Sequence, residues 1–475
     1  MSLSYPEPAS YRDPSGRIFY KDGRVLRTVT EYGRHAYEKT RGSSTVREAV
    51  NDGRIIDSTE LNDADELCPT TGDAYILEHP RIPFISYPYE WSFRQLQAAA
   101  VHHLDLQIEL LSEDIALSDA SAYNVQFVGS KPILIDRLSL VPYQPGQLWL
   151  GHRQFCEQFL NPLLLRSLTG IPHNDWFRGS LEGIPTKHIA SLVPFRKLLS
   201  WNILSHVVLP SKLDAKSLSA PDAAIARVNK KPHLSRLGYE GLLRQLRNWI
   251  FHLRPKNSKT TWGTYAEDNT YSDDEAVQKS QFISEFSSAV RPNKLIDLGC
   301  NTGNYSIAAL QSGASYVIGF DFDQTALDRA FSKAREANLN FLPLWLDAAN
   351  PSPRQGWDQS ERSGFSDRSR VDAVIALAFE HHLSLAKNIP LKNVVDWVID
   401  IAPEGIIEFV PKDDKTVQRM LALRDDIFSE YSIEAFRNFI SERATIVTEK
   451  TISKSGRTLF WFSRYSYDEK WRAGA

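Results

Sequence analysis

The sequence predicts an α/β fold for the C-terminal half of the chain, and two observations carry that prediction. Residues 295–310, LIDLGCNTGNYSIAAL, have the pattern of a short apolar strand, a turn of small residues and the beginning of a helix. Further apolar runs at 316–320, 341–346 and 371–377 each end beside a small or polar residue. Because ligands of such sheets bind beyond the carboxyl ends of the strands, the four ends define one crevice.

The turn after the first strand suits a ligand that lies against bare backbone. Gly299 and Gly303 carry no side chain, and the helix behind them begins with free N–H groups. Asn301 takes the place of the second glycine in a dinucleotide fingerprint, and no P-loop lysine follows, so a pyrophosphate is not favoured. Asp321 ends the next run, where a carboxylate can accept two hydrogen bonds from a ribose diol.

These motifs occur in the order DLGCNTG, GFDFD, LDAAN and VDAVIALA, and together they resemble class I S-adenosylmethionine-dependent methyltransferases. The resemblance covers residues 276–463. It implies a Rossmann-like, seven-stranded, mostly parallel sheet that closes with an antiparallel hairpin. The last three strands are expected at 405–410, 445–451 and 458–463, and S-adenosyl-L-methionine is the implied cofactor.

The same resemblance implies which residues bind the cofactor. Asp297, Gly299 and Gly303 hold its methionine side, Asp321 holds the ribose, and Asp347 flanks the adenine. The full implied set is Asp297, Gly299, Cys300, Asn301, Thr302, Gly303, Asp321, Phe322, Asp347, Ala348, Tyr271 and Lys279.

The segment before the first strand, residues 258–282, usually lies over the cofactor in this class of enzyme. Trp262, Tyr265 and Tyr271 are expected to form a lid, and Lys279 to reach the methionine carboxylate as a point charge. The alternative is that these aromatic side chains are surface residues that pack on the neighbouring helix.

A candidate general base follows the fourth strand, at Glu380, His381 and His382, which in this fold faces the methyl group. His382 is the first choice and His381 the second. Alternatively, the two histidines position the substrate or hydrogen-bond the strand end. Adjacent histidines with one glutamate do not form a ligand set, and the three cysteines lack metal spacing, so no metal is predicted.

The loop at residues 350–370 is long and polar, as loops that contact substrates tend to be. Trp357 and Arg362 are its most useful side chains for that purpose. A solvated loop without contacts explains the composition nearly as well.

The N-terminal half mixes strands and helices. Alternating residues around Asp22-Gly23 predict a β-hairpin within 11–31, and 74–87 is expected to be extended. Residues 34–50 and 91–111 have apolar residues at helical spacing. This half is therefore predicted to be α+β.

Asp119, Asn124 and Asp136 lie in SDASAYNVQFVGSKPILIDRLSL, residues 118–140. Their spacing resembles the base and the two magnesium ligands of the protein kinase and aminoglycoside phosphotransferase superfamily. A glycine-rich phosphate loop and the matching lysine are missing, and Arg-Leu follows Asp136 where Phe-Gly is expected. We predict a degenerate kinase-like domain. The alternatives are a loop in which Asp119 and Asn124 cap turns, and a working phosphotransferase.

A chain of 475 residues is too long for one core. The predicted domains are a kinase-like domain at 1–210, a linker with an amphipathic helix at 211–257, and a methyltransferase domain with its lid at 258–475. The composition is ordinary for a globular protein, with 42% hydrophobic and 24% charged residues.

A net charge of -3 gives no electrostatic argument for nucleic acid, and Ala-Phe-Glu-His replaces the Asn-Pro-Pro-Tyr motif of many base methyltransferases. An apolar stretch of about 18 residues and a signal-peptide pattern are both missing, so we expect a cytoplasmic protein without membrane contact.

The acceptor is expected to be a small or carrier-bound molecule. The C-terminal pattern is also similar to bacterial methyltransferases associated with rhizobial nodulation. The rival hypotheses are an enzyme that also phosphorylates, and a non-catalytic binding protein.

Overall fold

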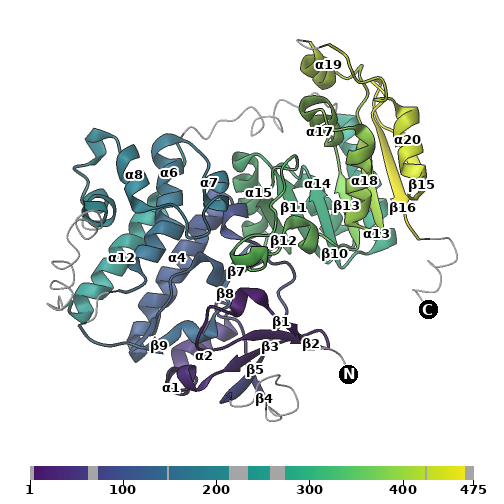
Figure 1. Ribbon diagram of the computed structural model, residues 1–475. Coiled ribbons are helices and arrows are strands. Elements are labelled where there is room, and N and C mark those ends of the chain that lie inside the picture. Colours follow the sequence, from purple (N-terminus) through teal and green to yellow (C-terminus); the bar gives the residue numbers. More distant parts are fainter. Residues whose placement is uncertain are drawn as a thin grey trace. The chain divides into compact units, whose positions relative to one another are not determined.

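The computed structural model describes residues 5–61, 73–146, 149–212, 234–256, 273–422 and 425–465. The chain forms two compact units (Figure 1). The first unit comprises Met1–Ser258 and Arg354–Arg362, and the second comprises Lys259–Pro353 and Ser363–Ala475.

A seven-stranded mixed sheet, in the order β12-β11-β10-β13-β14-β16-β15, forms the centre of the second unit (Figure 1). The first five of these strands are parallel, and β16 pairs antiparallel with both β14 and β15. The expected closing hairpin is therefore present. The strands are β10 (Lys294–Leu298), β11 (Tyr316–Asp321), β12 (Phe341–Trp345), β13 (Ala373–Ala376), β14 (Glu404–Phe409), β15 (Thr445–Thr451) and β16 (Thr458–Ser463).

Helices cover this sheet, which explains why its central strands are continuous apolar runs. One hydrophobic cluster joins α13 (Asp273–Val290), α14 (Asn304–Gln311) and α15 (Gln324–Glu336) to one set of strand side chains. A further helix, α18, packs against β13 and β14, and α20 packs on α18. The remaining bounds are α16 (Phe365–Arg368), α17 (Glu380–Lys387), α18 (Leu391–Ile401), α19 (Lys415–Leu421) and α20 (Ile433–Ser441).

The first unit contains a five-stranded antiparallel sheet in the order β1-β2-β3-β5-β4. The predicted hairpin is confirmed: Asp22 and Gly23 join β2 to β3 with positive φ angles of 52° and 77°, as a tight type I′ turn requires. Two small antiparallel sheets of two strands each follow, one formed by β6 with β9 and the other by β7 with β8. The strands are β1 (Tyr5–Pro6), β2 (Ile18–Lys21), β3 (Arg24–Val29), β4 (Thr59–Leu61), β5 (Tyr75–His79), β6 (Ile115–Leu117), β7 (Val125–Val128), β8 (Lys131–Leu134) and β9 (Leu140–Pro142).

The predicted amphipathic helix is α12 (Arg236–His252), and it packs along the long helix α4 (Phe93–Leu110). Gln97 Nε2 on α4 donates to the carbonyl oxygens of Ile250 and Leu253, at 2.7 and 3.0 Å. The helix therefore belongs to the first unit, which differs from the separate linker segment that we predicted. The apolar side of α12 accounts for this packing, because its side chains Tyr239, Leu243, Leu246 and Ile250 are buried.

The other helices of the first unit are short. They are α1 (Glu31–Thr40), α2 (Ser44–Asn51), α5 (His152–Phe155), α6 (Asn161–Thr169), α7 (Asn174–Arg178), α8 (Thr186–Leu192) and α9 (Trp201–Ile203). Among the helices of the described residues, none has the length and apolarity needed to cross a membrane.

Part of the predicted substrate loop belongs to the first unit. Within it, the Arg362 guanidinium lies 4.3 Å from the centre of the Tyr123 ring, and Gln355 Nε2 donates to the carbonyl oxygen of Arg178 at 2.7 Å. Glu361 accepts from the Tyr11 hydroxyl at 2.5 Å and pairs with Arg12 at 2.7 Å. Gln355, Glu361 and Arg362 therefore have partners in the first unit, so solvated disorder does not describe these three residues. Trp357 is 70% exposed.

Candidate active site

The glycine turn after β10 is held against the next strand. The backbone N–H groups of Gly299 and Cys300 both donate to the carbonyl oxygen of Phe320, at 2.8 and 3.0 Å. Gly303 has a φ of 81°, and a Cβ atom there would lie 2.4 Å from a ring carbon of Phe341. Glycine is thus required at the N-terminus of α14 by both backbone conformation and space.

Asp321, at the end of β11, is fixed beside this turn. Its Oδ2 accepts from the Asn301 N–H and its Oδ1 from the Asp323 N–H, each at 2.8 Å. Every carboxylate oxygen has two lone pairs, so both oxygens keep the capacity to accept from a ligand hydroxyl. Burial raises the pKa of Asp321 to about 6.

Asp297 lies deeper, on β10, where only 2% of its surface is exposed. The Ser306 hydroxyl donates to its Oδ2 at 2.5 Å. Burial raises the pKa of Asp297 to about 7, and the charge of Asp321 adds to this effect. The predicted methionine and ribose carboxylates are therefore electrostatically coupled neighbours.

The predicted adenine side lies at the ends of β11 and β12. The Leu346 N–H donates to the carbonyl oxygen of Asp321 at 3.0 Å, which joins the two strand ends. Asp347 follows, and its Oδ1 accepts from the Ala349 N–H at 3.0 Å. Phe322 is 62% exposed, with its ring 5.9 Å from that of Trp345. An exposed ring beside Asp321 is available to stack on a flat ligand. The predicted members Thr302 and Ala348 lie in the turn and beside Asp347, respectively.

Lys279 on α13 is buried and already paired. Its Nζ lies 2.7 Å from Glu408 Oε2, and the same carboxylate accepts from the Ala378 N–H at 2.8 Å and pairs with Arg457 at 3.3 Å. Lys279 can therefore reach a cofactor carboxylate only by sharing its charge with Glu408. The predicted lid residues Trp262, Tyr265 and Tyr271 lie outside the described residues.

Comparison with known proteins gives one match within the second unit and one that spans nearly the whole chain. Residues 281–352 match the ribosomal protein L11 methyltransferase (PrmA) family. Nodulation protein NoeA of Rhizobium meliloti (strain 1021) is 47% identical over 458 residues, which cover 96% of this chain and 95% of that protein. The chain belongs to the NoeA family.

Other likenesses of this NoeA-family chain are shorter. A ribosomal protein L11 methyltransferase of Thermotoga petrophila is 38% identical over 55 residues, which cover 12% of this chain and 21% of that protein. The crystal structure of magnesium protoporphyrin IX methyltransferase from Synechocystis PCC 6803 with bound SAH is 19% identical, covers 40% of this chain and 86% of that one, and has a TM-score of 0.30.

The motif residues and the PrmA match together identify the second unit as a class I S-adenosylmethionine-dependent methyltransferase domain. Its cofactor is S-adenosyl-L-methionine. Asp297, the turn from Gly299 to Gly303, and Asp321 fit that group, because they combine open backbone with carboxylates for a ribose diol and a cationic ligand.

The predicted catalytic residues of the NoeA-family chain begin α17, after β13. Glu380 is buried, and its Oε1 accepts from the Val410 N–H at 2.9 Å and from the Tyr431 hydroxyl at 2.8 Å. The rings of His381 and His382 lie 4.1 Å apart, and His382 is the more exposed of the two. Burial, aided by the neighbouring His381, lowers the pKa of His382 to about 3. His382 is thus a neutral imidazole, whereas Glu380 ties the helix start to β14 and Tyr431.

The second unit contains a buried charge network that was not predicted from the sequence. Glu408 on β14 is fully buried, and Arg457 bridges it to Asp414, whose Oδ2 lies 2.7 Å from Arg457 Nε. Burial by itself raises the pKa of Glu408, but the charges of Lys279 and Arg457 outweigh burial and lower it. The sequence feature that could have indicated this network is the single acid inside the apolar run GIIEFV, residues 405–410.

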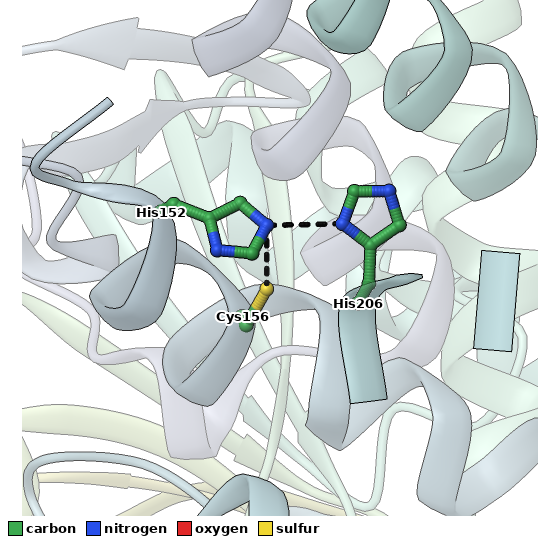
Figure 2. A group of neighbouring side chains, drawn as sticks. All are labelled: His152, Cys156 and His206. Carbon is green, nitrogen blue, oxygen red and sulfur yellow. Dashed lines mark hydrogen bonds between the residues drawn. The ribbon is translucent and has the colours of Figure 1, made fainter. Parts of the chain in front are cut away.

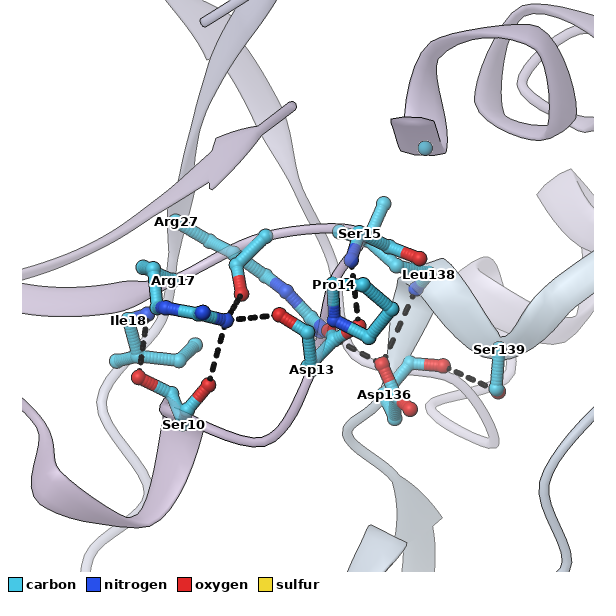
Figure 3. Close-up of polar contacts among 12 residues, drawn as sticks. Ser10, Asp13, Pro14, Ser15, Arg17, Ile18, Arg27, Asp136, Leu138 and Ser139 are labelled. Carbon is cyan, nitrogen blue, oxygen red and sulfur yellow. Dashed lines mark hydrogen bonds and ion pairs between the residues drawn. The ribbon is translucent and has the colours of Figure 1, made fainter. Parts of the chain in front are cut away.

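In the first unit, Asp119, Asn124 and Asp136 do come together. Asn124 Nδ2 donates to Asp119 Oδ2 and to Asp136 Oδ2, both at 3.2 Å. Arg27 on β3 extends between two acids, with its guanidinium 2.7 Å from Asp136 and 2.6 Å from Asp13 (Figure 3). A side-chain cation is therefore already paired with Asp136. Burial raises the pKa of Asp119, and the charge of Asp136 contributes.

Proposed function

We propose that this protein transfers the methyl group of S-adenosylmethionine to a small-molecule or carrier-bound acceptor. We further propose that the first unit is a degenerate kinase-like scaffold or substrate-recognition module. The main observation that supports methyl transfer is that Asp297, the glycine turn and Asp321 lie together at the carboxyl ends of the adjacent strands β10 and β11. The relative in Rhizobium meliloti is named for nodulation, and we extend that role to this chain as part of the proposal.

The cofactor supplies a methyl group on a positively charged sulfonium, which loses its charge as the methyl leaves. The tasks left to the protein are therefore alignment and exclusion of water. Correct alignment can lower the barrier by roughly 7–11 kcal/mol. Phe379 packs its ring 6.2 Å from that of Trp397, stacked at 19°, beside the start of α17. This apolar wall suits a site from which water is excluded.

His382 is the residue that we propose to orient the acceptor. With a pKa of about 3 it is uncharged near neutral pH, and a neutral imidazole has one N–H donor and one acceptor nitrogen with which to bind an acceptor hydroxyl or amine. The low pKa makes it a weak base, because general-base catalysis is most effective when the pKa lies near the working pH. Orientation is therefore the larger part of its proposed role.

Cofactor binding is tested by calorimetric titration with S-adenosylhomocysteine. Asp321→Ala should weaken binding at least roughly tenfold, the equivalent of about one charge-assisted hydrogen bond. The matched control is Asp372→Ala, because Asp372 accepts from the Lys294 N–H at the opposite edge of the sheet, where β10 and β13 begin. The control should bind like the wild type. Equal affinity of Asp321→Ala and the control would refute the assignment of the ribose site.

The acceptor class is tested by incubating the protein with isotopically labelled S-adenosylmethionine and a cell extract, followed by mass spectrometry of the products. The proposal expects label in a small-molecule or carrier-bound product that Asp321→Ala does not form. Label confined to nucleic acid would contradict the proposed acceptor class.

A second candidate function, phosphoryl transfer in the first unit, is favoured by the meeting of Asp119, Asn124 and Asp136. The pairing of Arg27 with Asp136 argues against it, since phosphoryl transfer needs that carboxylate for magnesium. We expect no binding of magnesium-ATP in a titration. ATP turnover that Asp136→Asn abolishes would instead establish an enzyme with two activities.

A further inference from the structure

A cluster of metal-ligating side chains lies in the first unit, and the methyl-transfer site does not use it. His152, Cys156 and His206 each present one ligand atom, and these atoms all lie within 4.8 Å of one another. Figure 2 shows the two imidazole rings and the thiol pointing toward a common point. His152 Nε2 lies 2.9 Å from His206 Nδ1 and 3.6 Å from Cys156 Sγ.

The backbone that presents these side chains is unusual. His152 and Cys156 are four residues apart, so successive helical turns place them on one face. Cys156 is the first residue of a π-helical turn, Cys156–Leu160, and His206 lies within a second one, Leu204–Val208. Such turns are rare and occur frequently at functional sites. Each of the two turns carries one member of the cluster.

Hydrogen bonding accounts poorly for three atoms at one point. A neutral imidazole nitrogen offers either one N–H or one lone pair. If His152 Nε2 carries hydrogen, it can donate to His206, but it cannot accept from the Cys156 thiol. If it does not, two donors must share its single lone pair. A metal ion satisfies all three atoms, because each ligand directs its own lone pair at the ion.

The two distances from His152 Nε2 can be compared with those around a tetrahedral ion. Usual zinc bond lengths place two nitrogen ligands about 3.3 Å apart, and a nitrogen and a sulfur ligand about 3.6 Å apart. The nitrogen–sulfur distance already has that value, and the nitrogens of His152 and His206 need to separate by only about 0.4 Å.

Aromatic side chains pack against the two imidazole rings and hold them in place. The Trp249 ring stacks on His206 at 5.9 Å, and Trp149 meets His152 edge-on at 5.7 Å. Cys156 and His206 are 2% and 3% exposed, whereas His152 is only half-buried.

We propose that His152, Cys156 and His206 bind one divalent transition-metal ion, with zinc as the favoured ion. Imidazole and thiolate are the ligands that zinc takes most readily in proteins. Within the part of the chain that the structure describes, the group has three protein ligands, so the fourth position is left to water. Binding releases the thiol proton of Cys156 to solvent. The site does not depend on the proposed methyl transfer.

The test uses the full chain, produced without a polyhistidine tag and purified without chelator. Inductively coupled plasma mass spectrometry should find one zinc ion per chain. Cys156→Ser and His206→Asn should lose the ion. His252→Asn should keep it. This variant is the matched control for His206→Asn, because it makes the same substitution at an exposed histidine of the same unit. Folded ligand variants that keep the full metal content would overturn the proposal.

A second measurement can be made on the wild-type protein itself. Wild-type protein loaded with cobalt should show a thiolate-to-cobalt charge-transfer band in the near ultraviolet, and added zinc should remove it. Cys156→Ser should lack this band. Wild-type protein that is purified without metal and then binds neither zinc nor cobalt would also overturn the proposal.

Discussion

At the scale of single residues, the carboxyl groups of Asp297 and Asp321 determine the cofactor binding that we propose. Asp297 and Asp321 belong to adjacent parallel strands, and burial raises their pKa values to about 7 and about 6. Because the two groups interact, their protons leave as those of a coupled pair. The pair therefore retains protons near neutral pH, and a positively charged ligand with donor hydroxyls would favour their release.

This coupling predicts how binding depends on pH. A ribose diol donates to ionised Asp321, so protonation of Asp321 weakens the interaction. Affinity for S-adenosylhomocysteine should be constant above the raised pKa values and should fall roughly tenfold between pH 8 and pH 5. Calorimetric titrations across this range check the prediction, and Asp321→Asn should flatten the profile. Affinity that rises as the pH falls would contradict it.

Lys279 gives the second residue-scale prediction. Lys279→Met removes one partner of a buried ion pair and leaves Glu408 with Arg457 alone. We expect the free energy of unfolding to fall by roughly 3 kcal/mol, measured by denaturant titration, with a smaller effect on cofactor affinity. Unchanged stability together with a large loss of affinity would instead make Lys279 a direct cofactor ligand, as the sequence suggested.

At the scale of elements, the glycine turn and the helix behind it act as one unit. Gly303→Ala would force a positive φ on alanine and place its Cβ against Phe341. We expect a loss of about 2 kcal/mol or more in stability, together with weaker cofactor binding. Gly241→Ala is the matched control, because Gly241 lies in α12 and a Cβ atom there would meet no neighbouring atom within 4 Å, and it should gain about 0.5–1 kcal/mol. Thermal unfolding of the two variants should therefore shift in opposite directions.

Elements with a local signal could be predicted from the sequence. The hairpin at Asp22-Gly23 and the turn from Gly299 to Gly303 depend on residues that are adjacent in the chain. The network of Glu408 and Arg457 could not, because its partners are 49 positions apart and nothing local pairs them. The metal-ligating cluster escaped for the same reason, since His206 lies 54 positions from His152.

At the scale of the whole molecule, the acids of the proposed cofactor site differ from Asp136 of the first unit in whether a basic side chain pairs with them. In the second unit Asp297 and Asp321 have raised pKa values and accept hydrogen bonds, but no basic side chain among the described residues forms an ion pair with either. In the first unit Arg27 already pairs with Asp136. A cationic cofactor therefore suits the second unit, while Asp136 of the first unit already has a cationic partner. This difference underlies the proposed division into a methyl-transfer unit and a scaffold.

The most direct test of the central claim is a crystal structure of the full chain with S-adenosylhomocysteine. The account predicts one bound molecule over the turn from Gly299 to Gly303, with both ribose hydroxyls within hydrogen-bonding distance of Asp321 and the adenine beside Asp347. A nucleoside bound elsewhere, with Asp297, Asp321 and Asp347 facing separate cavities, would contradict it.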